Sequence, residues 1–381
     1  MKYLFIFLFF LLSVVAKAQW QRIPTLSGGG ELIDGVIFDA QRMAVISRNA
    51  SSYTTDGGAT WNRSFIPETP GFVLAKLIKI SDVKGIASGK SVNGQGLLIQ
   101  TLDAGKNWTI LARIPVTSVS RIQFVSADTG FIQCEPNSFW KTVDGGHNWV
   151  RMIMPDGLEQ FVRGVDFFDG NRGYLYMNKN SGPPNYNTNA FRLYKTTNGG
   201  QSWIMTRDFS GATLDYISTL KTLAPDRLVF GSIYPEKLYL SVDGGVSDIQ
   251  VVSEAELPYN SESRWFKDGP NSWTYYRAGC YPSLGYNSCK TRVHRTTNNG
   301  VTWQTQQSIG CDRNVVSTLP PISSTHLEVG ENGKIVLFDR KTGSRYYLSH
   351  GVTSANMTPL ENGEVRMVGN SGVAFFNSQF T

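Results

Sequence analysis

The chain has 381 residues, with 36 Lys and Arg against 30 Asp and Glu and a formal net charge of +6. Only 17% of the residues are charged, whereas 38 are glycine and 12% are aromatic, a composition typical of many short strands joined by tight turns. The basic residues form no polybasic run and no nucleic-acid motif, so we expect no nucleic-acid partner. Because no helical periodicity follows the first eighteen residues, an all-β fold is predicted.

The N-terminus has the features of an export signal. Lys2 precedes an apolar run over residues 4–15, and Ala16-Lys17-Ala18 offers a cleavage site. The apolar run is too short to span a bilayer comfortably, and no later stretch is long and apolar enough, so no membrane span is expected. We therefore predict a signal peptide over residues 1–18 and a single domain over residues 19–381, secreted or periplasmic. A retained N-terminal anchor is the alternative.

The rest of the chain is dominated by a repeat. Six segments share the form [ST]-x-[DN]-x-G-x-[TSN]-W, and they begin at residues 54, 101, 142, 196, 241 and 296, which is 41 to 55 residues apart. The fifth copy departs from this form, because Asp248 stands where the others have Trp. Repeats of this length predict a solenoid or a propeller.

The chemistry of the repeat is that of a turn. The third residue offers a side-chain oxygen to the N–H groups of the turn, and the glycine two residues later supplies a positive φ. Since the same residues recur in every copy, we assign the third residues a structural role rather than a catalytic or metal-binding one. They are Asp56, Asp103, Asp144, Asn198, Asp243 and Asn298.

Strand-like runs precede each copy, such as residues 77–83 and 96–101 before the turn of the second copy. Each unit therefore predicts a four-stranded antiparallel blade of a β-propeller, with the repeat as the turn between its third and fourth strands. Two degenerate units, over 327–348 and 364–379, bring the count to eight blades, and seven is the alternative. The last unit lacks a strand that residues 20–24 can supply, so strands from both termini are expected to close the ring.

The six segments resemble the Asp-box, or BNR, motif. Over residues 20–61 and 113–149 the layout is similar to that of the photosystem II assembly/stability factor-like family of BNR propellers. This resemblance implies a non-enzymatic protein that binds or helps to assemble a partner. More distantly, Arg22-Ile23-Pro24 resembles the N-terminal signature of sialidases, although Gln21 stands where that family has an aromatic residue. A sialidase-like glycoside hydrolase is the alternative function.

Few residues suggest catalysis. The four histidines are dispersed, none has a metal-ligand spacing, and no hydrolase or nucleotide-binding motif is present. No tyrosine–acid pair can be assigned to the nucleophile that a sialidase needs. We therefore expect no enzyme activity, no metal and no cofactor.

The candidate binding surface is the face opposite the repeat turns, where the connections between second and third strands would emerge. Two of these connections are long and carry tyrosines that suit recognition: Tyr186, Tyr281 and Tyr286. Four arginines fall at or just before first strands, which line the channel, and could attract an anionic partner: Arg121, Arg163, Arg264 and Arg313. Tolerated insertions, and arginines that are simply exposed or paired with nearby acids, are the alternatives.

Four cysteines complete the candidates. Cys280 and Cys289 lie in one predicted hairpin of an exported chain, so we expect them to form a disulfide. Cys134 and Cys311 belong to blades that are not adjacent and are expected to be free, although Cys311 could compete for Cys280. The predicted partner is a protein or a glycan, and the sequence leaves the oligomeric state open.

Overall fold

The structure is a computed structural model. It describes residues 21–22, 32–39, 41–67, 72–135, 138–155, 162–180, 189–209, 217–232, 237–246, 250–254, 262–280, 289–307, 326–331, 334–339, 345–348, 355–359, 365–369 and 372–376. The named elements of these residues are all β-strands, and none of the residues forms a helix that is long and apolar enough to cross a bilayer. The predicted signal peptide lies outside the described residues.

Antiparallel sheets of four strands are the unit of the fold, as predicted. We number the sheets in chain order, and in each of the first six the strands hydrogen-bond in sequence order. Sheet 1 contains β2 (Leu32–Ile37), β3 (Met43–Ser47), β4 (Ser51–Thr54) and β5 (Asn62–Arg63); sheet 2 contains β6 (Val73–Lys79), β7 (Gly85–Lys90), β8 (Gly96–Thr101) and β9 (Thr109–Ile114); sheet 3 contains β10 (Ser118–Phe124), β11 (Gly130–Glu135), β12 (Ser138–Thr142) and β13 (Val150–Arg151).

The second half of the chain continues the pattern. Sheet 4 contains β14 (Val162–Phe167), β15 (Gly173–Asn180), β16 (Asn189–Thr196) and β17 (Ile204–Asp208); sheet 5 contains β18 (Ile217–Ala224), β19 (Arg227–Ser232), β20 (Lys237–Ser241) and β21 (Gln250–Glu254); sheet 6 contains β22 (Glu262–Gly269), β23 (Ser272–Cys280), β24 (Cys289–Thr296) and β25 (Gln304–Gln307). Sheet 7 has three described strands, β26 (His326–Glu331), β27 (Lys334–Asp339) and β28 (Arg345–Leu348). Sheet 8 combines β29 (Ala355–Pro359), β30 (Val365–Gly369) and β31 (Gly372–Phe376) with β1 (Gln21–Arg22) from the N-terminus.

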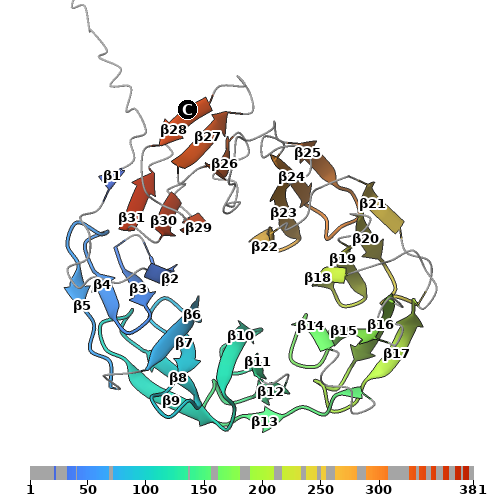
Figure 1. The fold of residues 1–381 in the computed structure, drawn as a ribbon, viewed down its shortest axis with the longest axis horizontal. Helices are drawn as coiled ribbons and strands as arrows, with labels where there is room; N and C mark the ends of the chain where they lie inside the picture. Colours follow the sequence, from blue (N-terminus) through green and yellow to red (C-terminus); the bar gives the residue numbers. More distant parts are fainter. Residues whose placement is uncertain are drawn as a thin grey trace, which may run out of the picture.

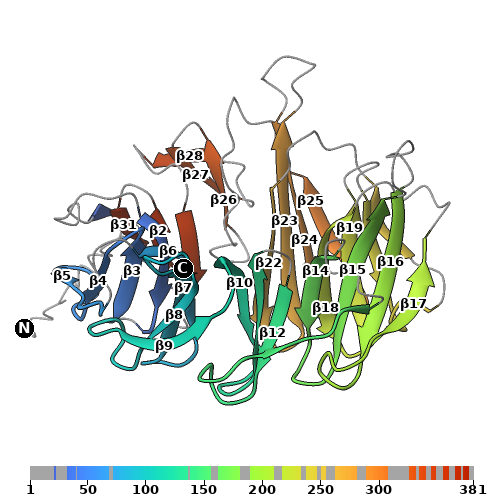
Figure 2. The same cartoon turned by 60° about the horizontal axis from the view of Figure 1, so that its bottom comes forward.

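The sheets follow one another in a circle, and in sheets 1 to 6 the first strand lies on the inside and the last on the outside (Figure 1). Seen from the side, the long β15–β16 and β23–β24 hairpins rise on one face of the ring (Figure 2). Pairing of β1 with β31 joins Gln21 to Phe375 and Arg22 to Ala374. The two ends of the chain therefore contribute to one sheet.

The first strand of sheet 2 begins and ends earlier in the chain than the sequence predicts. We expected a strand over 77–83, but β6 ends at Lys79, because the Ser81 hydroxyl accepts the N–H groups of Val83 (3.4 Å) and Lys84 (3.0 Å) and turns the chain. A serine hydroxyl offers the main chain an alternative to the ladder, and an apolar run alone does not reveal it.

Hydrophobic clusters fill the space between neighbouring sheets. Trp108 is fully buried between sheets 1 and 2, where its indole N–H donates to the Ser51 hydroxyl 3.1 Å away. Between sheets 3 and 4, the rings of Phe131 and Phe167 stack with centroids 3.5 Å apart. The other repeat tryptophans that the structure describes are only half-buried, so full burial between sheets holds for Trp108 alone among them.

The repeat turns are held by their own side chains. In the third copy the Thr142 hydroxyl accepts the Gly146 N–H (3.0 Å) and donates to Asp144 Oδ1 (2.8 Å), which also accepts the Asn148 N–H (2.9 Å). The Asn148 side-chain amide donates to Asp144 Oδ2 at 2.7 Å. The seventh residue of the repeat thus bonds back to the acid at the third position. Both oxygens of Asp144 are therefore occupied, which supports a structural role.

Each repeat turn is also tied to the turn between the first and second strands of its own sheet. The N–H of the fourth repeat residue donates to a carbonyl of that turn, for example Gly199 to Asn171 (2.7 Å) and Gly244 to Asp226 (2.7 Å). The same bond recurs in all six copies at 2.7 to 2.9 Å. The two turns therefore share one face of the ring, and the first strands start on the opposite face.

Glycine is required at the fifth repeat position for two reasons. Its φ lies between +84° and +98° in all six copies, where a side chain is strained. The turn also abuts the preceding sheet: a Cβ on Gly105 would lie 2.3 Å from the Ala44 Cβ, and one on Gly200 would lie 2.1 Å from the Met152 methyl group. The repeat turns thus pack each sheet against its predecessor.

Candidate functional site

The first strands of sheets 1 to 5 share a β-bulge near their start. Register shifts leave one residue of each strand unpaired, and in sheet 4 that residue is Arg163. In sheet 3 the unpaired residue is Ser120, and Arg121 follows it directly. A bulge redirects side chains away from the regular pleat. Both arginine side chains are exposed.

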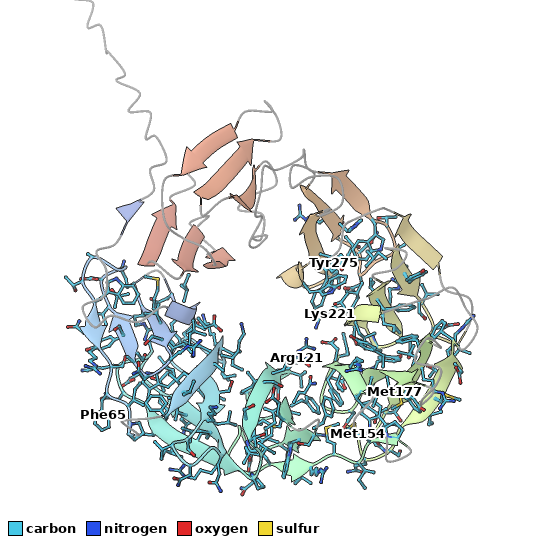
Figure 3. The ribbon with its side chains drawn as sticks, in the orientation of Figure 1. Phe65, Arg121, Met154, Met177, Lys221 and Tyr275 are labelled. Carbon is cyan, nitrogen blue, oxygen red and sulfur yellow. The ribbon has the colours of Figure 1, made fainter. Side chains whose placement is uncertain are left out.

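These bulges lie on the inner strands, at the end away from the repeat turns. First strands start on the face opposite the repeat turns, so Arg121 and Arg163, which are near those starts, lie toward that face. In Figure 3 the side chains of Arg121 and Lys221 point toward the centre of the ring. The structure therefore brings two of the four predicted arginines to the inner strands of adjacent sheets.

Two lysines that the sequence analysis missed extend this cationic surface. Lys76 occupies the position after the bulge in β6, as Arg121 does in β10, and its ammonium lies 3.0 Å from Asp34 Oδ2. Lys221 of β18 lies 2.7 Å from Asp166 Oδ1. Aligning the first strands of the repeats would have shown the equivalence of Lys76 and Arg121, but not that Lys76 pairs with Asp34.

The two carboxylates that meet these lysines join neighbouring sheets. Asp34 of β2 accepts the Leu77 N–H of β6 at 3.0 Å, and Asp166 of β14 accepts the Thr222 N–H of β18 at 2.8 Å. Both acids are nearly buried, at 4% and 8% exposed. Their oxygens therefore satisfy main-chain donors and lysines of the adjacent sheet.

Arg121 and Arg163 differ from the lysines in this respect. Among the described residues, no carboxylate lies within ion-pair distance of either guanidinium. Four cations on the repeat-turn side, in contrast, each bridge two neighbouring sheets. Lys84 donates to the Gly145 carbonyl (3.2 Å), Lys141 to the Gly170 carbonyl (2.7 Å) and Arg227 to the Asn299 carbonyl (3.4 Å), and Lys195 pairs with Asp226.

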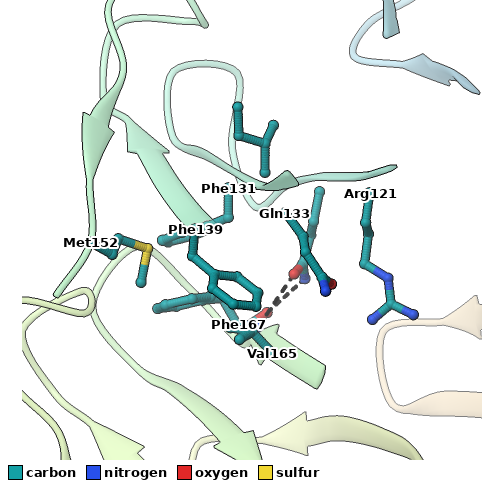
Figure 4. A pocket seen from close by; sticks show the side chains of 9 residues that line it. Arg121, Phe131, Gln133, Phe139, Met152, Val165 and Phe167 are labelled. Carbon is teal, nitrogen blue, oxygen red and sulfur yellow. Dashed lines mark hydrogen bonds between the residues drawn. The ribbon is translucent and has the colours of Figure 1, made fainter. Parts of the chain in front are cut away.

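A small cleft opens beside Arg121, between sheets 3 and 4 (Figure 4). Its volume is about 20 Å³, which is room for about one water molecule. Gln123 spans its rim, accepting the Phe167 N–H (3.3 Å) and donating to the Phe167 carbonyl (2.9 Å). Pockets for small molecules are far larger, at about 300–1,000 Å³. Arg121 is thus a surface group rather than part of an enclosed pocket. The other residues that line the cleft are Phe131, Ile132, Gln133, Phe139, Met152 and Val165.

Reactive groups are few in the described part of the chain. No cluster of His, Cys, Asp and Glu there could hold a metal ion. Cys134 is 1% exposed, and burial raises the pKa of its thiol to about 12, so it stays protonated and unreactive. The thiol is free, as expected.

The other predicted site residues fall partly outside the described structure. Arg264 lies in β22, but its side chain is not described. Arg313 and the loop tyrosines Tyr186, Tyr281 and Tyr286 lie outside the described residues, as does Cys311. Cys280 and Cys289 are direct neighbours across the β23–β24 pair, at its end.

Comparison with known proteins supports the fold. No family model and no curated protein sequence matches the chain. Among solved structures, a YCF48 protein bound to a D1 peptide has a TM-score of 0.51 and 13% identity, covering 94% of this chain and 96% of that chain. Sqt1 of Saccharomyces cerevisiae has a TM-score of 0.57 and 11% identity, covering 94% and 97%. At these identities the similarity establishes a β-propeller fold and nothing about function.

Proposed function

We propose that this chain is an exported binding or assembly propeller that holds an acidic segment of a protein partner at the channel mouth, on the face opposite the repeat turns. In this proposal the ring has eight blades, sheets 1 to 8, and is closed by β1 from the N-terminus pairing with β31 from the C-terminus. The repeat turns belong to Asp-boxes and serve as scaffold.

One observation carries the proposal. Arg121 and Arg163 are exposed on bulged inner strands of adjacent sheets, with no described carboxylate in reach, whereas four cations of the repeat-turn side hold neighbouring sheets together. Guanidinium groups bind carboxylates through two parallel hydrogen bonds, which favours an acidic partner.

A protein is the better fit for the partner. The cleft beside Arg121 admits about one water-sized group, so recognition must take place on the surface. Exposed charges on a surface mainly raise the association rate and select the partner by its charge. The YCF48 structure, which shares the fold, is bound to a peptide.

Charge reversal tests the proposal on the chain from residue 19 onward. The probe is a fluorescent peptide of consecutive glutamates, and the variant is Arg121→Glu with Arg163→Glu. We expect its affinity at low ionic strength to fall at least about tenfold, which is about 1.4 kcal/mol. The loss should shrink at about 0.15 M salt, where exposed charges are screened beyond about 8 Å.

The matched control reverses two exposed cations elsewhere, Arg63 on outer strand β5 and Lys106 in a repeat turn. It changes the net charge by the same amount and should leave binding within about twofold. Equal weakening by both double variants would show that the peptide senses only net charge, and would contradict the proposal. Turnover of a fluorogenic sialoside by the wild type, lost in Arg22→Ala, would replace the binding function with a glycosidase.

A further inference from the structure

We propose that Asn93-Gly94 is a site of spontaneous deamidation in the folded protein, on the face of the ring opposite the repeat turns. Five Asn-Gly steps occur in the sequence, and three lie in the described residues: 93–94, 198–199 and 299–300. The structure separates the first from the other two. This inference does not depend on the proposed partner.

Asn93 lies in the turn between β7 and β8 and has a free side chain. Both Asn93 and Gly94 are exposed, and no described residue hydrogen-bonds to the Asn93 amide. The φ of Gly94 is +73°, and a Cβ placed there would meet nothing within 4 Å. The Gly94 N–H makes one turn bond, to the Ser91 carbonyl at 3.0 Å. An exposed turn of this kind opens at little cost.

In the other two Asn-Gly pairs, both the Asn side chain and the N–H of the following Gly are hydrogen-bonded. Asn198 receives the Ser202 N–H at its Oδ1 (3.0 Å) and donates to the Ser202 hydroxyl (2.8 Å), while the buried Gly199 N–H donates to a carbonyl 2.7 Å away. Asn299 accepts an indole N–H at 3.2 Å and donates to an amide oxygen at 2.9 Å, and the Gly300 N–H is bonded at 2.7 Å. Reaction requires breaking several of these bonds.

The reaction needs no partner but water. The Gly94 nitrogen loses its proton and attacks the Asn93 side-chain carbonyl carbon, and the bond from that carbon to the amide nitrogen breaks, so that ammonia leaves. The resulting five-membered imide is opened by water at either carbonyl. One opening gives Asp, and the other gives isoaspartate, in which the main chain runs through the former side chain. Both products carry a carboxylate that the Asn side chain lacked.

The new charge would appear on the face of the ring that carries Arg121 and Arg163. The β7–β8 turn is a connection between second and third strands and so lies opposite the repeat turns, as do Arg121 and Arg163. The Asp product keeps the turn, because the Gly94 backbone is unchanged. Isoaspartate inserts one extra main-chain atom and shifts the register of a two-strand turn.

Peptide mapping of the folded protein tests the inference. After incubation at mildly alkaline pH in water enriched in heavy oxygen, the Asn93 peptide should gain label and isoaspartate at least about tenfold faster than the Asn198 and Asn299 peptides, which lose hydrogen bonds on reacting. In denaturant the three rates should converge to within a few-fold. Asn93→Gln should abolish the Asn93 signal and leave the other two unchanged.

Two results would overturn the inference. One is labelling of the Asn198 or Asn299 peptide as fast as the Asn93 peptide in the folded protein, which would mean that the hydrogen bonds do not protect. The other is an Asn93 peptide that stays unlabelled when folded but reacts in denaturant, which would mean that the β7–β8 turn is itself protective.

Discussion

Two repeat tryptophans allow a matched test of what a buried indole N–H contributes to stability with and without a hydrogen-bond acceptor. Trp149 and Trp203 occupy the same position in consecutive repeats, and each packs edge-on against a phenylalanine, with ring centroids 6.2 and 6.0 Å apart. The Trp149 indole N–H donates to the Gly146 carbonyl at 2.8 Å. The Trp203 indole nitrogen is buried, and no described residue accepts its proton.

Replacing each tryptophan with phenylalanine should lower the free energy of unfolding by different amounts. Both changes delete the same atoms, so the loss of packing is similar and cancels in the comparison. Trp149→Phe also loses a hydrogen bond worth about 1 kcal/mol, whereas Trp203→Phe removes an unsatisfied donor whose burial costs about 1–3 kcal/mol. Trp149→Phe should therefore be less stable than Trp203→Phe by about 2 kcal/mol or more.

Urea unfolding, followed by fluorescence and circular dichroism, measures the difference. Coincident transitions by both probes are required before free energies are compared. Equal free energies of unfolding for the two variants, or a lower value for Trp203→Phe, would refute the reasoning and show that Trp203 has a partner in solution.

Three further predictions follow from the repeat turns and the long hairpin. Gly105→Ala should lower the free energy of unfolding by about 2 kcal/mol or more in urea titrations, because the φ is +95° and the Ala44 methyl group, fixed to the backbone, cannot move aside. The Asn148 N–H and side-chain amide, with the Thr142 hydroxyl, hold the pKa of Asp144 well below its usual range. The ionised Asp144 carboxylate therefore stabilises the folded protein fully at pH values above its pKa in the unfolded chain, about 3.9. This stabilisation is lost as the pH falls through the lower pKa of the folded state. The difference in thermal midpoint between the wild type and Asp144→Ala should therefore disappear in acid. Non-reducing peptide maps should show Cys280 linked to Cys289, since Cα atoms opposed in an antiparallel pair are about 4.5–5.5 Å apart, within the range of a disulfide; two free thiols in protein from an oxidising compartment would contradict this.

The fold was predictable because its information is local and repeated. A turn such as Thr142 to Trp149 contains its own donors, acceptors and glycine, so six copies in the sequence identify six hairpins without any knowledge of distant contacts. Strand boundaries were less accurate where a serine turn interrupts an apolar run, as at Ser81. The pairing of β1 with β31 followed from counting strands in the last repeat.

The candidate site was predictable only in part. Repeat position alone places Arg121 and Arg163 on the first strands of their sheets, but the bulges that redirect them are a property of strand register and leave no mark in the composition. Lys76 shows the limit most clearly. It occupies the position equivalent to Arg121, yet it is paired, because Asp34 lies on the neighbouring sheet some forty residues earlier. The pairing of Lys76 is thus decided by a contact between sheets.

Four of the bridges on the repeat-turn side run forward along the chain, whereas Lys79 of sheet 2 donates back to the Phe38 carbonyl of sheet 1 at 2.6 Å. Lys84 reaches from sheet 2 to sheet 3, Lys141 from 3 to 4, Lys195 from 4 to 5 and Arg227 from 5 to 6, so in each pair the donor precedes its acceptor in the chain. For the four forward bridges a ribosome produces the donor first, so each of sheets 2 to 5 presents a lysine or arginine whose acceptor has yet to emerge. These bridges consequently form in the order of synthesis. A nascent chain gains them one at a time, long before β31 exists to meet β1.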